Sequence, residues 1–198
     1  DRLGTGALFT QSLNKTLRLG SLGLASGATL TMNNLNGYGL LFGGALDFGM
    51  SLGTTLSVVT ASPSDLVQGL TLSGVVSGGA TGSGVVTFTK GGAGTLTLAG
   101  VNTWTGPILV SGGLIATAND YSLGAAASVN SAGGAITLNG GGLSAAASFT
   151  LNSNRSLALI GNGSLDAAAG QTLTYAGYAA GFGALSKTGS GTLALNAA

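Results

Sequence analysis

The sequence contains no cysteine, no histidine and no glutamate in its 198 residues. Without cysteine there is no disulfide framework and no thiol chemistry. Without histidine or glutamate, the segment cannot assemble a Ser-His-Asp triad, a Cys-His pair, a paired-glutamate glycosidase site or a standard zinc site. We therefore predict a protein that is not an enzyme, with no catalytic residue, no bound cofactor and no metal site.

Charge is also scarce, since only 6% of the residues are charged and the formal net charge is +1. The basic residues are scattered and form no basic patch with interleaved aromatics, so we predict no nucleic-acid partner. A weakly charged surface gives little electrostatic resistance to self-association, so we expect end-to-end or lateral contacts between copies. The basic residues are Arg2, Lys15, Arg18, Lys90, Arg155 and Lys187.

Two short motifs look functional but lack an essential residue. Residues 49–53 have the Gly-x-Ser-x-Gly spacing of a serine nucleophile, yet no histidine is present to activate Ser51. Residues 91–95 are similar to a calcium-binding Gly-Gly-x-Gly-x-Asp repeat, but Thr95 stands where an aspartate must coordinate the ion. We interpret the aspartates as solvated turn residues, although a solenoid could bring two pairs of them together: Asp47 with Asp65, and Asp120 with Asp166.

Glycine is abundant, at 38 residues, but it follows no Gly-X-Y period, which excludes collagen. Hydrophobic residues make up 44% of the chain, enough to form a core and to argue against disorder. Short Leu-x-Leu units followed by turn residues recur along the whole chain at irregular intervals, and no segment shows a capped helical period. The sequence therefore predicts an all-β protein.

Residues 88–116 carry the clearest strand pattern. The runs Thr95–Leu98, Ile108–Val110 and 114–116 are strand-like and are separated by glycine, asparagine and proline. In the first run, leucines alternate with threonines, so the two leucines should share a face that is buried in the core.

The beginning of this pattern returns near the end of the chain. Residues 187–195 repeat residues 90–98 with the lysine, two glycines, the threonine and both leucines identical. The two lysines are 97 residues apart (187 − 90), a spacing that suits about four or five solenoid turns of roughly 20 to 25 residues.

Residues 90–106 read Lys-x-Gly-x-Gly-Thr-Leu-x-Leu-x-Gly-x-Asn-x-Trp-Thr-Gly. This pattern resembles the passenger-associated transport repeat of bacterial autotransporters, and residues 185–198 resemble the start of a second copy. The resemblance implies a secreted, single-stranded, right-handed parallel β-helix, or β-solenoid, at the cell surface of a Gram-negative-type bacterium or outside it. It also implies export through an outer-membrane β-barrel at the C-terminus of the parent chain.

From the strand spacing we expect about nine rungs, stacked at the usual interstrand distance. We expect residues 1–198 to form one continuous solenoid that is a fragment or repeat unit of a longer secreted protein, with motifs at 88–116 and 185–198. By resemblance, a structural role in the scaffold falls to Lys90, Gly92, Gly94, Thr95, Leu96, Leu98, Asn102, Trp104 and Gly106, and to Lys187, Gly189, Gly191, Thr192, Leu193 and Leu195.

The first functional hypothesis is a non-catalytic extracellular scaffold that serves as a stalk, an adhesin or a matrix component. The alternatives are a self-assembling fibre subunit, the scaffold part of a polysaccharide-active β-helix enzyme, and a transmembrane barrel. An adhesive surface would take a host or matrix glycan or protein as its ligand. The aromatic candidates for such contacts are Tyr121, Tyr175 and Tyr178, but packing in the core or at a corner is the favoured interpretation of each. Trp104 is expected to cover an edge of the core.

Overall fold

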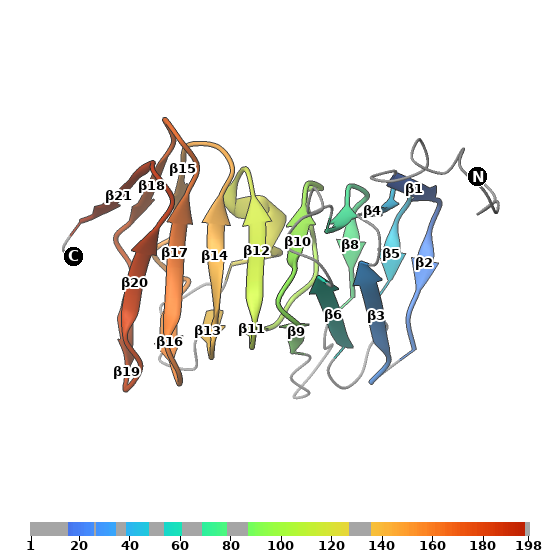
Figure 1. Ribbon diagram of the computed structural model, residues 1–198, viewed down its shortest axis with the longest axis horizontal. Helices are drawn as coiled ribbons and strands as arrows, with labels where there is room; N and C mark the ends of the chain where they lie inside the picture. Colours follow the sequence, from blue (N-terminus) through green and yellow to red (C-terminus); the bar gives the residue numbers. More distant parts are fainter. Residues whose placement is uncertain are drawn as a thin grey trace, which may run out of the picture.

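The computed structural model describes residues 16–25, 27–34, 39–47, 54–60, 69–78, 87–126 and 136–196. They form a rod of stacked strands, with the N-terminal end on the right of Figure 1 and the C-terminal end on the left. Within these ranges every strand pairing is parallel, unlike the antiparallel pairing of a transmembrane barrel. The same ranges contain no helix long and apolar enough to cross a membrane.

The longest sheet, which we name sheet 1, contains one strand from each turn of the solenoid. Its eight strands define coils 1 to 8, slightly fewer than the nine rungs expected from the sequence. In order, the strands are β1 (Thr16–Leu19), β4 (Gly39–Phe42), β7 (Leu70–Leu72), β10 (Thr95–Leu98), β12 (Gly113–Thr117), β14 (Gly141–Ala145), β17 (Gly163–Ala167) and β20 (Leu185–Thr188).

A second sheet, sheet 2, forms another side of the rod and contributes one strand to each of coils 1 to 7. Its strands are β3 (Thr29–Asn34), β6 (Thr54–Thr60), β9 (Phe88–Gly91), β11 (Ile108–Val110), β13 (Ile136–Leu138), β16 (Leu157–Leu159) and β19 (Ala179–Gly181).

The third side of the rod, between sheets 1 and 2 in chain order, changes structure midway. Coils 1 to 3 form one three-stranded sheet there and coils 6 to 8 form another, while coil 5 has a short 3-10 helix in its place. We name the two sheets 3N and 3C. Sheet 3N contains β2 (Leu22–Gly23), β5 (Leu46–Asp47) and β8 (Val76–Ser77); sheet 3C contains β15 (Phe149–Leu151), β18 (Thr172–Tyr175) and β21 (Thr192–Leu195); the helix is η3 (Asp120–Leu123).

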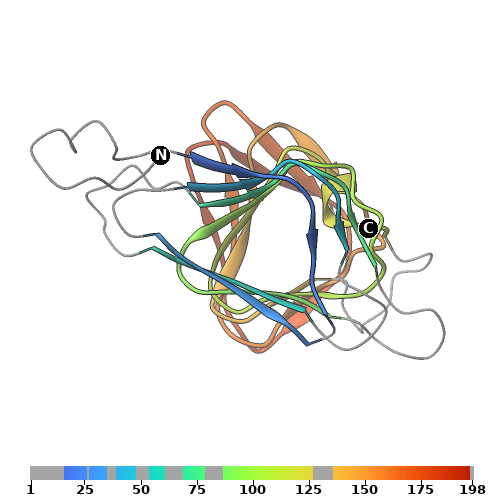
Figure 2. The same ribbon diagram turned by 90° about the vertical axis from the view of Figure 1, so that its right-hand side faces the viewer.

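The winding is right-handed, as the motif resemblance implied. Figure 2 faces the N-terminal end, where β1 lies at the top, β2 runs down the right side and β3 crosses the base toward the left. The chain therefore turns clockwise as it recedes from the viewer, which is a right-handed helix. The fold class predicted from the sequence, an all-β parallel solenoid, is confirmed.

The core is built from side chains of the same kind stacked coil on coil. In sheet 1, Leu70, Leu96, Ile115, Leu143 and Leu165 occupy equivalent positions in successive strands, and each is at most 1% exposed. Each such side chain contributes about 1.5–3 kcal/mol on burial. The alternation expected for β10 is also confirmed, because both of its leucines are fully buried and both threonines are partly exposed.

Candidate functional site

The repeat motif begins at a corner between sheet 2 and sheet 1. Lys90 lies on the inward face of β9 and is fully buried. It is in register with Val110, in a column that otherwise contains aliphatic residues. Its ammonium Nζ donates to three corner carbonyls, those of Gly91 at 2.7 Å, Gly92 at 2.9 Å and Gly112 at 3.0 Å. Burial lowers the pKa of Lys90 from 10.5 to about 8.

The corner turns on glycines because the backbones of neighbouring coils meet there. Gly92 has a φ of +70°, in the left-handed region that glycine enters without strain. Gly113 of the next coil has a φ of +59°, and a Cβ at that position would lie 2.2 Å from the carbonyl oxygen of Gly94. The amide of Leu114 donates to that same Gly94 oxygen at 3.3 Å, so the motif glycine also links coils 4 and 5.

After β10, Asn102 joins three coils through its side chain and lies only 5% exposed. Its Oδ1 accepts from the amide of Val76 at 2.7 Å in coil 3, and its Nδ2 donates to the carbonyl of Ser122 at 2.6 Å in coil 5. Both partners are buried, so either would lose its hydrogen bond if the amide side chain were removed. This asparagine therefore maintains the hydrogen bonding between coils where sheet 3N ends.

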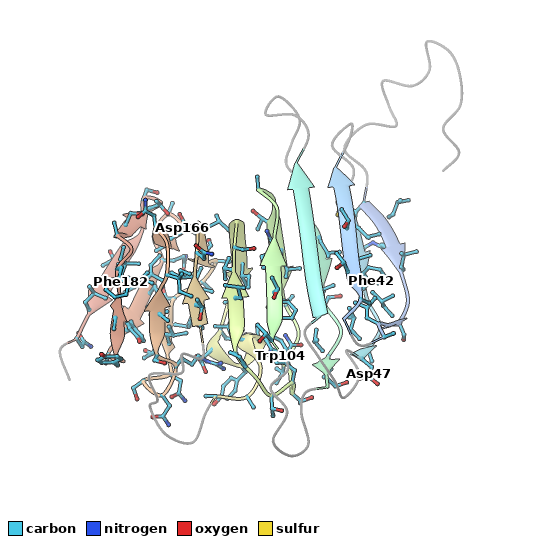
Figure 3. The ribbon with its side chains drawn as sticks, turned by 90° about the horizontal axis from the view of Figure 1, so that it is seen from below. Phe42, Asp47, Trp104, Asp166 and Phe182 are labelled. Atoms are coloured by element: carbon cyan, nitrogen blue, oxygen red, sulfur yellow. The ribbon has the colours of Figure 1, made fainter. Side chains whose placement is uncertain are left out.

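Trp104 is part of the core, as expected. It is 3% exposed and stacks on Phe88, with ring centroids 5.0 Å apart and an interplanar angle of 19°. Figure 3 shows it beside the short helix of coil 5. Gly124 fits against its ring, since a Cβ there would lie 2.7 Å from the indole. The motif closes at Gly106, whose φ is +138°.

The second copy of the motif makes the same turn on a different side of the rod. Lys187 lies in β20 of sheet 1 and its Nζ donates to the carbonyl of Gly189, which has a φ of +70° like Gly92. Thus the first copy turns from sheet 2 into sheet 1, whereas the second turns from sheet 1 into sheet 3C. The two copies therefore form the same kind of corner at different positions in the coil.

The remaining residues of the second copy line this later corner. A Cβ on Gly189 or Gly191 would lie 2.3 Å or 2.2 Å from a backbone carbonyl oxygen of coil 7. In β21, Thr192 is exposed, Leu193 is half-buried and packs against the core, and Leu195 is 61% exposed.

A buried ion pair that the sequence did not reveal holds the 3-10 helix of coil 5. Arg155, in coil 6 and 2% exposed, donates from Nε to Oδ1 of Asp120 at 2.8 Å. Its guanidinium also donates to the carbonyls of Leu123 at 3.1 Å and Gly124 at 2.5 Å, which are left without helical partners where η3 ends. At the other end of the helix, the side chain of Asn119 accepts from the amide of Ser122.

The network extends into coil 7 through Tyr175. Its hydroxyl lies 2.9 Å from the carbonyl oxygen of Arg155 and 2.7 Å from that of Tyr178. Tyr175 is 3% exposed and burial raises its pKa to about 12. Side chains therefore connect five successive coils along the third side, from Val76 through Asn102, η3 and Arg155 to Tyr175. This network spans the gap between sheets 3N and 3C.

Of the two aspartate pairs considered from the sequence, only Asp120 and Asp166 both lie within the described residues. Asp120 pairs with Arg155, while Asp166 accepts from Ser144 at 2.7 Å and Thr188 at 3.0 Å on sheet 1, so the two aspartates do not meet. Asp65 and the Gly-x-Ser-x-Gly stretch at 49–53 lie outside the described residues. Within the described ranges, no three acidic, histidine or cysteine side chains gather at a point where they could hold a metal ion.

Two comparisons with known proteins find related sequences. The family model described as passenger-associated-transport-repeat matches residues 88–116 and 185–198. The adhesin BmaC autotransporter of Brucella suis biovar 1 (strain 1330) is 42% identical over 126 residues. These matches support an autotransporter passenger segment with passenger-associated transport repeats, and we refer to the chain as the passenger segment. No solved structure gives a significant match to the passenger segment.

The match to the Brucella adhesin covers 58% of the passenger segment but only 4% of that adhesin. The passenger segment thus spans a small fraction of the relative it matches. As part of an autotransporter passenger, it belongs at the cell surface or in the extracellular space of a Gram-negative bacterium.

Proposed function

We propose that the passenger segment is a non-catalytic scaffold of a longer adhesin-like surface protein, in which it serves as a stalk that holds other parts away from the cell. The observation that carries this proposal is the location of the motif residues. Lys90, Asn102 and Trp104 are buried in contacts between coils, and the glycines form corners, so these residues hold the coils of the rod together.

The rest of the proposal concerns the parent protein. Residues 1–198 are one continuous solenoid portion of a longer chain, and an outer-membrane β-barrel in that chain exports them. The Brucella relative, which is named as an adhesin and autotransporter, supports this assignment. The absence of histidine, cysteine and glutamate supports a role without catalysis.

The test is negative-stain electron microscopy of the purified, tag-free segment over a concentration series. A stalk should appear as discrete short rods at every concentration. Long fibres of uniform width in dilute samples would contradict the stalk and favour a self-assembling fibre, which the low charge of the chain makes the second candidate. Turnover in a screen with polysaccharide substrates would contradict the non-catalytic role.

A display experiment addresses the role in the parent protein. The segment would be fused between a secretion signal and an autotransporter barrel, with a peptide epitope at its outer end. We expect the epitope to be labelled on intact cells. An epitope that remains inside the cell would count against the proposed export.

A further inference from the structure

The outward face of sheet 2 carries no charged side chain in any of its seven strands. Only β9 contains a charged residue, Lys90, and that side chain points into the core. By contrast, the outward face of sheet 1 carries the exposed Arg18 and the partly exposed Asp166. Sheet 2 is therefore an electrically neutral side of the rod.

At coils 6 and 7 this neutral face combines small residues with large exposed ones. Ala158 in β16 and Ala180 in β19 are paired in register and point outward. Tyr178 precedes β19 and is 52% exposed, while Phe182 follows it with its side chain fully exposed. Ala180 thus lies between two exposed aromatic side chains, with Ala158 beside it on the neighbouring strand. We name these four residues, together with Ile160, the alanine platform.

Ile160 indicates the direction in which this corner points. It occupies the position in coil 6 that Phe182 occupies in coil 7, directly after the strands paired as Leu159 with Gly181. Although coils 5 and 7 lie on either side of it, Ile160 remains 66% exposed. The column that contains Ile160 and Phe182 therefore faces solvent even where neighbouring coils are present.

Polar groups without charge border the platform. Asn139, directly after the strand of coil 5, is exposed next to Ile160 in the same column. Asn162, two residues after Ile160, is also exposed; its Oδ1 accepts from the amide of Ala184 at 3.1 Å. That bond orients the Asn162 amide and leaves its Nδ2 without a partner among the described residues. Two side-chain amides are therefore available to a ligand.

The charges nearby restrict what this surface can bind. The described cations of coils 5 to 8 are Arg155, which is buried against Asp120, and Lys187, whose Nζ donates to the carbonyl of Gly189 at the corner after β20. Neither is available on sheet 2, so a phosphate- or sulfate-bearing polymer would find no counter-charge. Apolar surface with a few fixed polar groups suits a ligand that has both apolar faces and hydroxyl groups.

We infer that the alanine platform binds a neutral polysaccharide, with sugar rings stacked on Phe182 and Tyr178 and hydroxyls bonded to Asn139 and Asn162. The alanines allow a ring to approach the strands between the two aromatic side chains. This inference rests on the proposed extracellular role and adds a ligand class to it.

The test is a glycan array that carries neutral and acidic glycans, probed with the purified 198-residue segment. We expect retention on neutral glycans, and a loss of about tenfold or more for Phe182→Ala, as for a truncated aromatic contact at the centre of an interface. Tyr121→Ala is the matched control, because Tyr121 is a 71% exposed aromatic on the 3-10 helix, away from sheet 2. Its binding should stay within about twofold of the unmodified segment.

Several results would overturn the inference. These are retention on acidic glycans alone, no retention on any neutral glycan, or equal losses for Phe182→Ala and Tyr121→Ala. A dimer in sedimentation that Phe182→Ala converts to monomer, with no glycan retained, would show that a second copy covers the platform instead. Thermal melts must show Phe182→Ala to be folded; if they do not, Tyr178→Ala replaces it with the same expected loss. Failure of the stalk would be seen separately, as missing rods in electron micrographs.

Discussion

The two copies of the repeat motif share their lysine, two glycines, threonine and two leucines and make the same turn, but their surroundings differ. Lys90 is fully buried and donates to three carbonyls, whereas Lys187 is exposed and donates to one. Leu96 is 0% exposed, and its counterpart Leu193 is only half-buried. The motif therefore encodes a corner, and the neighbouring coils decide how much of that corner is buried.

The largest expected difference between the copies concerns their leucines. Leu96→Ala should lower the free energy of unfolding by about 2–5 kcal/mol, because it removes a fully buried side chain between two other coils. Leu193→Ala should cost less than half as much. Urea titrations of the two variants beside the unmodified segment measure this, and equal losses would refute the claim that coil neighbours set the burial.

The lysines should differ in their effect on stability against pH. Lys90 has a pKa of about 8 in the folded segment and about 10.5 when exposed. Between these values the unfolded chain holds a proton that the folded chain has released. The free energy of unfolding should therefore rise with pH across this window, by an amount on the order of 3 kcal/mol, and stay flat with respect to this group below it.

The measurement is a set of urea titrations between about pH 7 and pH 9.5, below the range where Tyr175 titrates. Lys90→Met should remove the rise, and Lys187→Met should leave it in place. A rise that persists in Lys90→Met would mean that another group causes it.

A smaller effect is expected from the side-chain amide of Asn102, which bridges coils in the first copy. Asn102→Ala leaves the buried amide of Val76 and the buried carbonyl of Ser122 without their partner, which should cost about 1–3 kcal/mol. Asn162→Ala is the control, because Asn162 is exposed and should cost less than about 1 kcal/mol. Hydrogen exchange at the Val76 amide should accelerate only in Asn102→Ala.

The smallest expected effect compares a glycine in coil 7, Gly170, with a glycine in coil 8, Gly189. It separates the cost of backbone strain from the cost of a clash with a neighbouring backbone. Gly189 and Gly170 have φ values of +70° and +73°, but only a Cβ at Gly189 would clash, at 2.3 Å from the carbonyl of Ala167. Gly170→Ala should cost about 1 kcal/mol from strain alone, and Gly189→Ala should cost more. Equal melting temperatures for the two variants would show that the backbone of coil 8 can shift away from coil 7.

Much of the motif could be predicted from the sequence, because strands and turns depend on near neighbours. The run Thr95–Leu98 forms β10 with those bounds, Ile108–Val110 forms β11, and the leucines of β10 face the core. The count of about nine rungs was slightly high against eight strands in sheet 1. One coil adds 19 residues from Leu96 to Ile115 and another adds 30 from Leu40 to Leu70, so no regular period was available.

The third side of the rod could not be predicted. The ion pair of Arg155 with Asp120 joins residues 35 positions apart, and neither residue lies in a recognisable motif. Tyr175, an exposed candidate from the sequence, is buried in the same network, as its apolar ring and single hydroxyl allow. The other two candidates, Tyr121 and Tyr178, are both exposed.

The all-β class, the inward leucines and the glycine corners follow from the sequence alone, because side-chain alternation and positive φ are properties of a few adjacent residues. The folded rod was needed to show which side of the coil each motif copy occupies, why Lys90 is buried, and how Arg155 bridges the break between sheets 3N and 3C. Those outcomes depend on how many residues each coil contains, since coil length determines which distant side chains are stacked together.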